Sequence, residues 1–129
     1  MLNVSMDSMM YKLDRYRVDV DWLRPESYEE DHSLARKLAE GERKEWYSNM
    51  KSGAESGWDY SSRWFVKNQN QSAEDDILDV ETGNIIPVDL NAFLCKNAEI
   101  MENLFLQVEK PEKAAEYRKI RDALKEAIR

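Results

Sequence analysis

The sequence predicts an all-α protein, built from amphipathic helices joined by irregular loops. Four glycines and three prolines among 129 residues are too few for a β-protein rich in tight turns. The charged fraction of 35% exceeds the value of about 25% that is usual for soluble domains, and it suits exposed helix faces. Apolar residues recur at helical spacing in the C-terminal half. The length fits a single domain, since domains cluster near ~100–150 residues.

The N-terminal part predicts little regular structure. Residues 1–12 show no clear period and are interpreted as a loose N-terminal segment. Apolar residues then alternate with charged ones, which predicts a strand-like stretch with one buried face that ends before Pro25. The alternating apolar residues are Tyr16, Val18, Val20 and Trp22.

Two helical segments are predicted next. Ser27 and Glu30 have the spacing of a capping box, which opens a helix to about Glu40. Gly41 interrupts that pattern, and a second helix is predicted over residues 42–52. Residues 52–63 hold Gly, Ser and aromatic residues without a helical period, so they are predicted to form a loop.

Two further helices are predicted in the C-terminal third. Asp89 is a candidate N-cap for a helix whose apolar positions follow the spacing of one face. These positions are Leu90, Phe93, Leu94, Met101, Leu104, Phe105 and Val108. Pro111 suits the first turn of the last helix. The apolar face of that helix comprises Ala114, Tyr117, Leu124 and Ile128.

Composition excludes several classes of function. A net charge of −7 with scattered basic residues argues against nucleic-acid binding and against anionic membrane surfaces. His32 and Cys95 are the only residues of their types, so an internal disulfide is excluded and a metal site is not predicted. No cofactor is predicted either. The longest apolar run, residues 92–95, is far too short to span a membrane, and residues 1–10 do not resemble a signal peptide.

Residues 54–65 contain the ingredients of a sugar site, because aromatic rings stand beside carboxylates, hydroxyls and an arginine. Apolar sugar faces stack on tryptophan, and sugar hydroxyls form hydrogen bonds with charged side chains. A carboxyl group set against tryptophan stays protonated more readily and can act as an acid. The alternative from spacing alone is structural: Trp58 and Trp64 in a core, and Asp59 as a helix cap.

Three strings resemble trehalases of the animal and bacterial type. They are residues 24–28 (Arg-Pro-Glu-Ser-Tyr), residues 55–64 (Glu-Ser-Gly-Trp-Asp-Tyr-Ser-Ser-Arg-Trp) and residues 87–95 (Pro-Val-Asp-Leu-Asn-Ala-Phe-Leu-Cys). The resemblance runs from about Leu13 to about Leu124. It implies that residues 13–129 are part of a catalytic domain with an (α/α)6 barrel. It also implies hydrolysis of α,α-trehalose to glucose with inversion, which uses one carboxylic acid and one carboxylate base.

The resemblance also implies roles for individual residues. Asp59 is expected to be the general acid. The expected substrate-binding residues are Arg24, Pro25, Glu26, Gly57 and Trp58. Tyr60 stands where relatives commonly carry Phe. The catalytic base of the family lies downstream of the residue 87–95 string and is expected to be missing from this chain, so the 129 residues alone are expected to be inactive.

A second interpretation is a non-catalytic, truncated trehalase-like helical module, either a degenerate copy or an interaction protein. A partial barrel exposes apolar helix faces that would otherwise be covered, so this interpretation predicts self-association. Related trehalases are often secreted or membrane-anchored, and the sequence leaves the compartment of this chain open.

Overall fold

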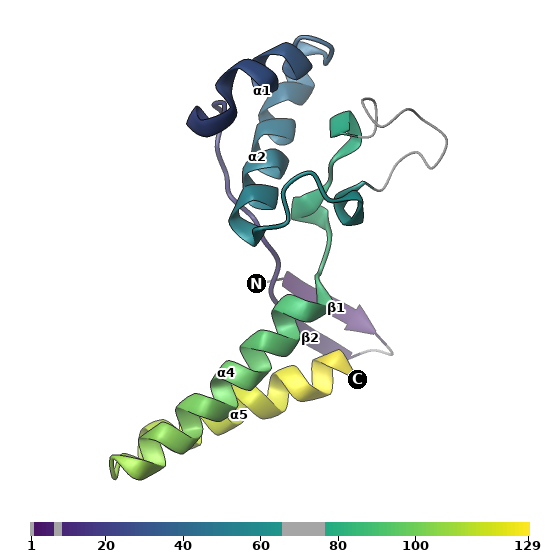
Figure 1. The fold of residues 1–129 in the computed structure, drawn as a ribbon. Helices are drawn as coiled ribbons and strands as arrows, with labels where there is room; N and C mark the ends of the chain where they lie inside the picture. Colours follow the sequence, from purple (N-terminus) through teal and green to yellow (C-terminus); the bar gives the residue numbers. More distant parts are fainter. Residues whose placement is uncertain (1, 7–8, 66–76) are drawn as a thin grey trace. The chain divides into compact units, whose positions relative to one another are not determined.

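The computed structural model describes residues 2–6, 9–65 and 77–129. The chain forms two compact units, one made of residues 1–15 with residues 86–129, and one made of residues 16–85. Helices dominate both, which confirms the all-α prediction and agrees with a fragment of a helical barrel (Figure 1). The helices are α1 (Tyr28–Ala35), α2 (Glu40–Ser56), α4 (Val88–Gln107) and α5 (Pro111–Ile128). None of the described helices is both long and apolar enough to cross a bilayer.

A β-hairpin replaces the loose N-terminal segment that the sequence predicts. Strands β1 (Leu2–Met6) and β2 (Met9–Leu13) pair antiparallel. An isolated two-stranded hairpin is marginal in water, so it needs support from elsewhere in the chain. Asn91 of α4 provides it: its Oδ1 accepts from the Asp14 N–H and its Nδ2 donates to the Asp14 carbonyl, both at 2.8 Å. Because this support lies 77 residues further along the chain, the local pattern did not reveal it.

Helices α4 and α5 form an antiparallel pair with a core of small side chains (Figure 1). Ala98 of α4 and Ala114 of α5 are buried, together with Leu124. Small residues let the two backbones approach closely, and a stacked ring pair completes the contact toward the connecting turn. The rings of Phe105 and Tyr117 lie 5.4 Å apart between centroids.

A charged cluster fixes the two helices against each other. Glu102 is buried on α4, and its carboxylate pairs with two arginines of α5. Arg118 Nε donates to Glu102 Oε1 at 2.7 Å, and Arg121 Nη1 donates to Oε2. A carboxylate this buried is tolerated only where its oxygens are paired, so the cluster sets the register of the pair.

The helix predicted after Asp89 is confirmed as α4, although Pro87 and not Asp89 is its N-cap, and its apolar face is only partly buried. Phe93, Leu104 and Val108 are 68%, 48% and 59% exposed. The buried positions are instead Asn91, Ala98 and Glu102, which lie on one helical face of their own. Hydrophobic periodicity predicts the helix correctly. Which side of α4 is buried depends on the elements that pack against it.

The boundaries of α1 and α2 differ from the prediction. Ser27 makes no side-chain capping bond, and residues Pro25–Ser27 form a 3₁₀ turn that leads into α1. Gly41 lies in the first turn of α2 instead of breaking it. The N-terminus of α2 is stabilised by Glu42, whose Oε2 accepts the Ala39 N–H at 3.2 Å.

The predicted strand-like stretch at residues 16–22 is not a strand in the structure. Its backbone is bound by serines of α2 in place of a partner strand. The Val18 N–H donates to Ser52 Oγ at 2.9 Å, and the Val20 N–H donates to Ser48 Oγ at 3.2 Å. Trp22, at the end of the stretch, is exposed.

Trp64 anchors the core of the second unit. A buried cluster surrounds it, and the Tyr16 and Trp64 rings meet in a T-shaped arrangement with centroids 6.3 Å apart. The buried members are Ala35, Trp46, Met50, Trp64 and Val80. Residues from α1, α2 and the segments after residue 61 therefore share one core.

Candidate functional site

The segment that carries Asp59 is a short turn with a fixed backbone. Helix α2 ends at Gly57, whose φ of 72° is the left-handed conformation that glycine adopts most readily. Ser56 Oγ accepts the Trp58 N–H at 3.0 Å. The Trp58 carbonyl accepts the Trp64 indole N–H at 2.9 Å and the Ser61 N–H at 3.2 Å. The turn is thereby tied to the end of α2 and to the core.

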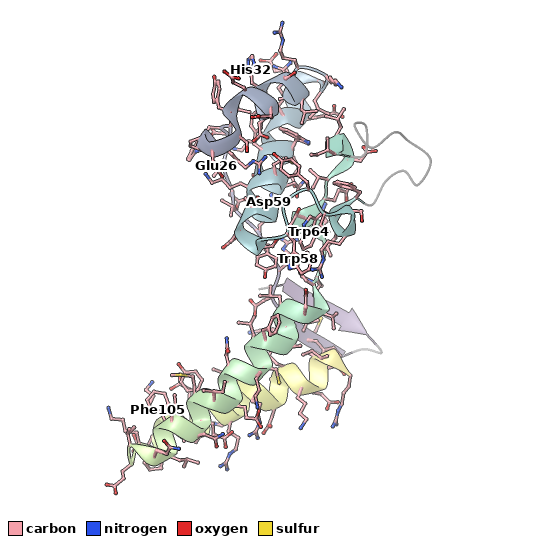
Figure 2. The ribbon with its side chains drawn as sticks, in the orientation of Figure 1. Glu26, His32, Trp58, Asp59, Trp64 and Phe105 are labelled. Carbon is pink, nitrogen blue, oxygen red and sulfur yellow. The ribbon has the colours of Figure 1, made fainter. Side chains whose placement is uncertain are left out.

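The two tryptophans of this segment have opposite roles. Trp64 is 1% exposed and belongs to the core, as the structural alternative predicts. Trp58 is 56% exposed, so its ring is available at the surface of the unit (Figure 2). The Arg63 guanidinium lies over both rings, with Cζ 5.3 Å from the Trp58 centroid and 4.9 Å from the Trp64 centroid. This cation–π contact helps to hold Trp58 in place.

Asp59 directly follows Trp58 in this turn and is exposed (Figure 2). No described residue donates a hydrogen bond to its carboxylate. It is therefore not a helix cap. The desolvating contact with tryptophan that the sequence suggests is not made within the described part of the chain.

Arg24 is 2% exposed and is clamped by Asp31, which is 1% exposed. Nε of Arg24 donates to Asp31 Oδ2 at 2.7 Å, and Nη2 donates to Asp31 Oδ1 at 2.8 Å. Nη2 also donates to the Tyr60 hydroxyl at 2.7 Å. The hydrogen bonds to Asp31 raise the pKa of Arg24 above its ordinary value, so the guanidinium stays charged despite burial.

These contacts join two of the sequence strings. Tyr60 directly follows Asp59, so its bond to Arg24 links the residue 24–28 string with the residue 55–64 string. Pro25 and Glu26 are exposed in the 3₁₀ turn before α1. No hydrogen bond or ion pair connects Glu26 with the described residues of the Asp59 turn.

Asp31 and Tyr60 are the residues that sequence reasoning missed at this site. Asp31 follows Glu29 and Glu30, and such a run is typical of the first turn of a helix. Its spacing of four residues from Ala35 was the available signal, since these two are the buried positions of α1. His32, the neighbour of Asp31, is exposed and stacks on the Tyr28 ring with centroids 6.0 Å apart.

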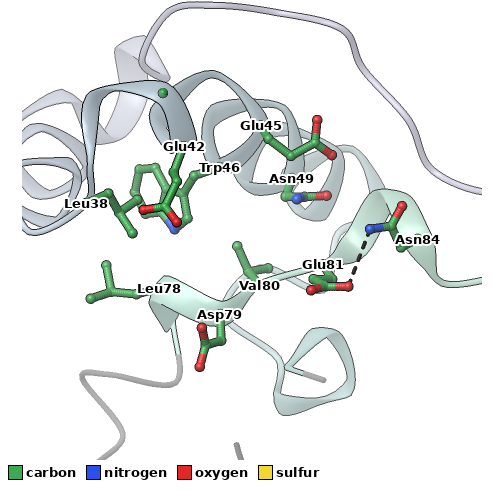
Figure 3. Close-up of a pocket in the computed structure, with 11 residues that line it drawn as sticks. Leu38, Glu42, Glu45, Trp46, Asn49, Leu78, Asp79, Val80, Glu81 and Asn84 are labelled. Carbon is green, nitrogen blue, oxygen red and sulfur yellow. Dashed lines mark hydrogen bonds between the residues drawn. The ribbon is translucent and has the colours of Figure 1, made fainter. Parts of the chain in front are cut away.

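A separate cavity of about 340 Å³ lies between α2 and residues 78–84 (Figure 3). Trp46 and Val80 form apolar walls, and carboxylates line it as well. The lining carboxylates are Glu42, Glu45, Asp79 and Glu81. None of the sequence-predicted site residues lines this cavity. Within the described residues, no group of three or more His, Cys, Asp or Glu side chains is placed to hold a metal ion.

The fold and this site define an all-α protein with a carboxylate and an aromatic ring presented on a fixed turn. The trehalase family profile matches residues 1–129, and this chain belongs to the trehalase family. Human trehalase is 41% identical over 120 residues, which cover 93% of this chain and 20% of that protein. Pimpla hypochondriaca trehalase is 38% identical over 128 residues, covering 98% and 22%.

A bacterial relative matches as well. The periplasmic trehalase of Salmonella paratyphi A is 35% identical over 116 residues, which cover 90% of this chain and 19% of that protein. The chain thus spans about a fifth of the length of the curated relatives it matches.

The opposite roles of the two tryptophans lead to a stability prediction. We expect Trp64→Ala to lower the free energy of unfolding by about 3–5 kcal/mol, because it empties the centre of a core. Trp58→Ala is the matched control and should cost less than about 1 kcal/mol, because most of that ring is in solvent. Urea denaturation followed by far-ultraviolet circular dichroism measures both. Equal losses would contradict the assignment of Trp64 to the core.

Proposed function

We propose that this chain is the part of an α,α-trehalase that supplies the general acid for hydrolysis of trehalose to glucose. Family membership supports the substrate and the reaction. In an inverting hydrolysis, a carboxylic acid protonates the leaving oxygen while a carboxylate on the other side of the sugar activates a water molecule. Asp59 is the acid in this proposal.

The observation that supports the proposal is that Asp59 lies in a turn with a fixed backbone and has a carboxyl group without a partner among the described residues. The backbone of Trp58, the residue before it, is fixed by bonds with Ser56 Oγ and with the Trp64 indole, while the Asp59 side chain has no partner among the described residues. A fixed backbone with a free carboxyl group suits a residue whose partner is a ligand, because catalytic groups must be held in place before substrate arrives.

The neighbouring groups supply the binding chemistry. The exposed Trp58 ring offers a flat apolar surface for a sugar face. Gly57 leaves its backbone open to close approach, since a Cβ at this position would meet nothing within 4 Å apart from its chain neighbours. Arg24 supplies charged donors, and Pro25 and Glu26 complete the proposed binding set from the adjoining turn. No cofactor takes part in this chemistry.

The catalytic base is proposed to lie in another part of the catalytic domain. Inverting enzymes hold the two carboxyl groups roughly 6.5–9.5 Å apart across the sugar. Residues 13–129 are then one portion of that domain, which agrees with a chain that spans about a fifth of its relatives.

A chimera tests the proposal. We expect the purified 129-residue chain to release no glucose from trehalose. Human trehalase in which these residues replace the matching segment should release it. A folded but inactive chimera would contradict the proposed function. Glucose release by the isolated chain, lost on Asp59→Asn, would show that the base is not supplied from elsewhere.

The exposed apolar residues of α4 favour a second candidate, a non-catalytic helical module that associates with itself. Phe93, Leu104 and Val108 stand in solvent on the described unit. Sedimentation of the purified chain separates the two candidates. Oligomers that dissociate on Phe93→Ser and Leu104→Ser substitution support the module, and a compact monomer counts against it.

A further inference from the structure

The donors of the Arg24 side chain are only partly used within the protein. A guanidinium carries five N–H donors. Three of them are engaged: Nε–H and one Nη2–H with Asp31, and the other Nη2–H with the Tyr60 hydroxyl. No described residue accepts a hydrogen bond from Nη1, which leaves two charged donors available.

The two hydrogen bonds between Arg24 and Asp31, together called the clamp, restrict how the Arg24 side chain can move. The two bonds to Asp31 are parallel, as in a bidentate pair, and both side chains are almost completely buried. The Tyr60 ring lies 5.2 Å from Cζ of Arg24, which adds a cation–π contact. With Nε and Nη2 held, the direction of Nη1 is set as well, because the guanidinium is planar and rigid.

Nη1 is not closed off from solvent. The buried side-chain polar atoms without a partner in the described residues are Arg43 Nε and Thr82 Oγ1. Arg24 Nη1 also lacks a partner but is not among them, so it retains some of the small exposed area of this residue.

Tyr60 contributes a further donor. Its hydroxyl oxygen accepts from Arg24, so the hydroxyl proton is left to donate, and no described residue accepts it. The residue is about half exposed and has a φ of 55°, which is uncommon outside glycine and costs of order 1 kcal/mol. Tyr60 adopts this conformation immediately after Asp59 and contacts Arg24 through its hydroxyl.

We propose that Asp31 and Tyr60 are positioning residues for Arg24, and that the Tyr60 hydroxyl donates a hydrogen bond to an oxygen of the bound sugar. This inference rests on the proposed function and deepens it, because it assigns a donor that faces the substrate. Sugar hydroxyl and ring oxygens are the acceptors that such a donor fits.

Tyr60→Phe in the chimeric trehalase is the decisive variant. It removes one hydroxyl from a half-exposed ring, so the fold is retained. We expect KM for trehalose to rise about tenfold with kcat unchanged, since the lost bond is made with the substrate in ground state and transition state alike. Tyr47→Phe is the matched control, because the Tyr47 hydroxyl makes no hydrogen bond with the described residues, and its kinetics should stay unchanged.

The clamp is tested without a substitution at Asp31. In the isolated chain, the Arg24 Nε–H resonance in nitrogen-15 NMR should exchange slowly with water, and it should stay slow in Tyr60→Phe because Asp31 still holds it. Rapid exchange in the unsubstituted chain would overturn the positioning role of Asp31.

The outcomes separate this inference from the proposed function. An unchanged KM in Tyr60→Phe, or a fall in kcat alone as expected for a purely structural role, overturns the inference. If Asp59→Asn abolishes hydrolysis in the same chimera, the proposed function stands in either case. Near-normal hydrolysis by Asp59→Asn overturns the proposed function and this inference with it.

Discussion

Asp59→Asn should lower trehalose hydrolysis by the chimeric enzyme roughly 10²–10⁴-fold. An amide cannot deliver a proton to the leaving oxygen, and general acid catalysis contributes a factor of about this size. The fold should not change, because the Asp59 side chain is exposed and has no partner among the described residues. Glucose release measures the activity, and urea denaturation measures the free energy of unfolding.

Asp21→Asn is the matched control for this substitution. Asp21 is also an exposed aspartate of the same unit, and its carboxylate accepts no hydrogen bond from the described residues. It should leave both activity and stability unchanged. Asp59 loses its assignment as the general acid if the two variants hydrolyse trehalose equally well.

Asp31→Asn should lower the free energy of unfolding by about 3–5 kcal/mol. The substitution leaves the Arg24 guanidinium charged and buried without its counter-ion, which is the costly way to break a buried pair. Asp122→Asn is the comparison, because Asp122 pairs with Arg121 at the surface and such pairs contribute about 0–1 kcal/mol. Urea denaturation of the 129-residue chain measures both, and equal small losses would contradict a stabilising clamp.

The pH dependence of this pair follows from the pKa of Arg24, which its hydrogen bonds with Asp31 raise. A cation whose pKa is higher in the folded state contributes its full stability below the pKa of the unfolded state, and it loses that contribution only as pH rises through the folded value. In the unfolded chain the guanidinium already loses its proton only under strongly basic conditions. The stability difference between the wild-type chain and Asp31→Asn should therefore stay constant from neutral pH to about pH 10.

The helices could be predicted from the sequence because their signals are local. Helix α5 begins at Pro111 as predicted, and Ala114 and Leu124 of its predicted face are buried. The side of α4 that is covered could not be predicted. It depends on Asn91 and Glu102, whose partners lie on other elements of the unit.

The candidate site was likewise predicted only in part from the sequence. The strings at residues 24–28 and 55–64 located the turn of Asp59 and drew attention to Arg24. Spacing did not show that Asp31 and Tyr60 hold Arg24, since these contacts join positions 7 and 36 residues apart. Trp64 is buried because it packs in the core cluster, whereas Trp58 stays exposed, and composition does not distinguish the two tryptophans.

The bond between Asn91 and the backbone of Asp14 has a consequence for how the chain is made. During synthesis, the β-hairpin emerges from the ribosome well before α4 and α5, the elements that support it. The described core residues of the second unit, by contrast, lie between Tyr16 and Ile85 and emerge together. Since translation adds about 5–20 residues per second, the hairpin strands wait several seconds for their support. The unit of residues 16–85 can thus fold first, and the β-hairpin packs with α4 and α5 afterwards.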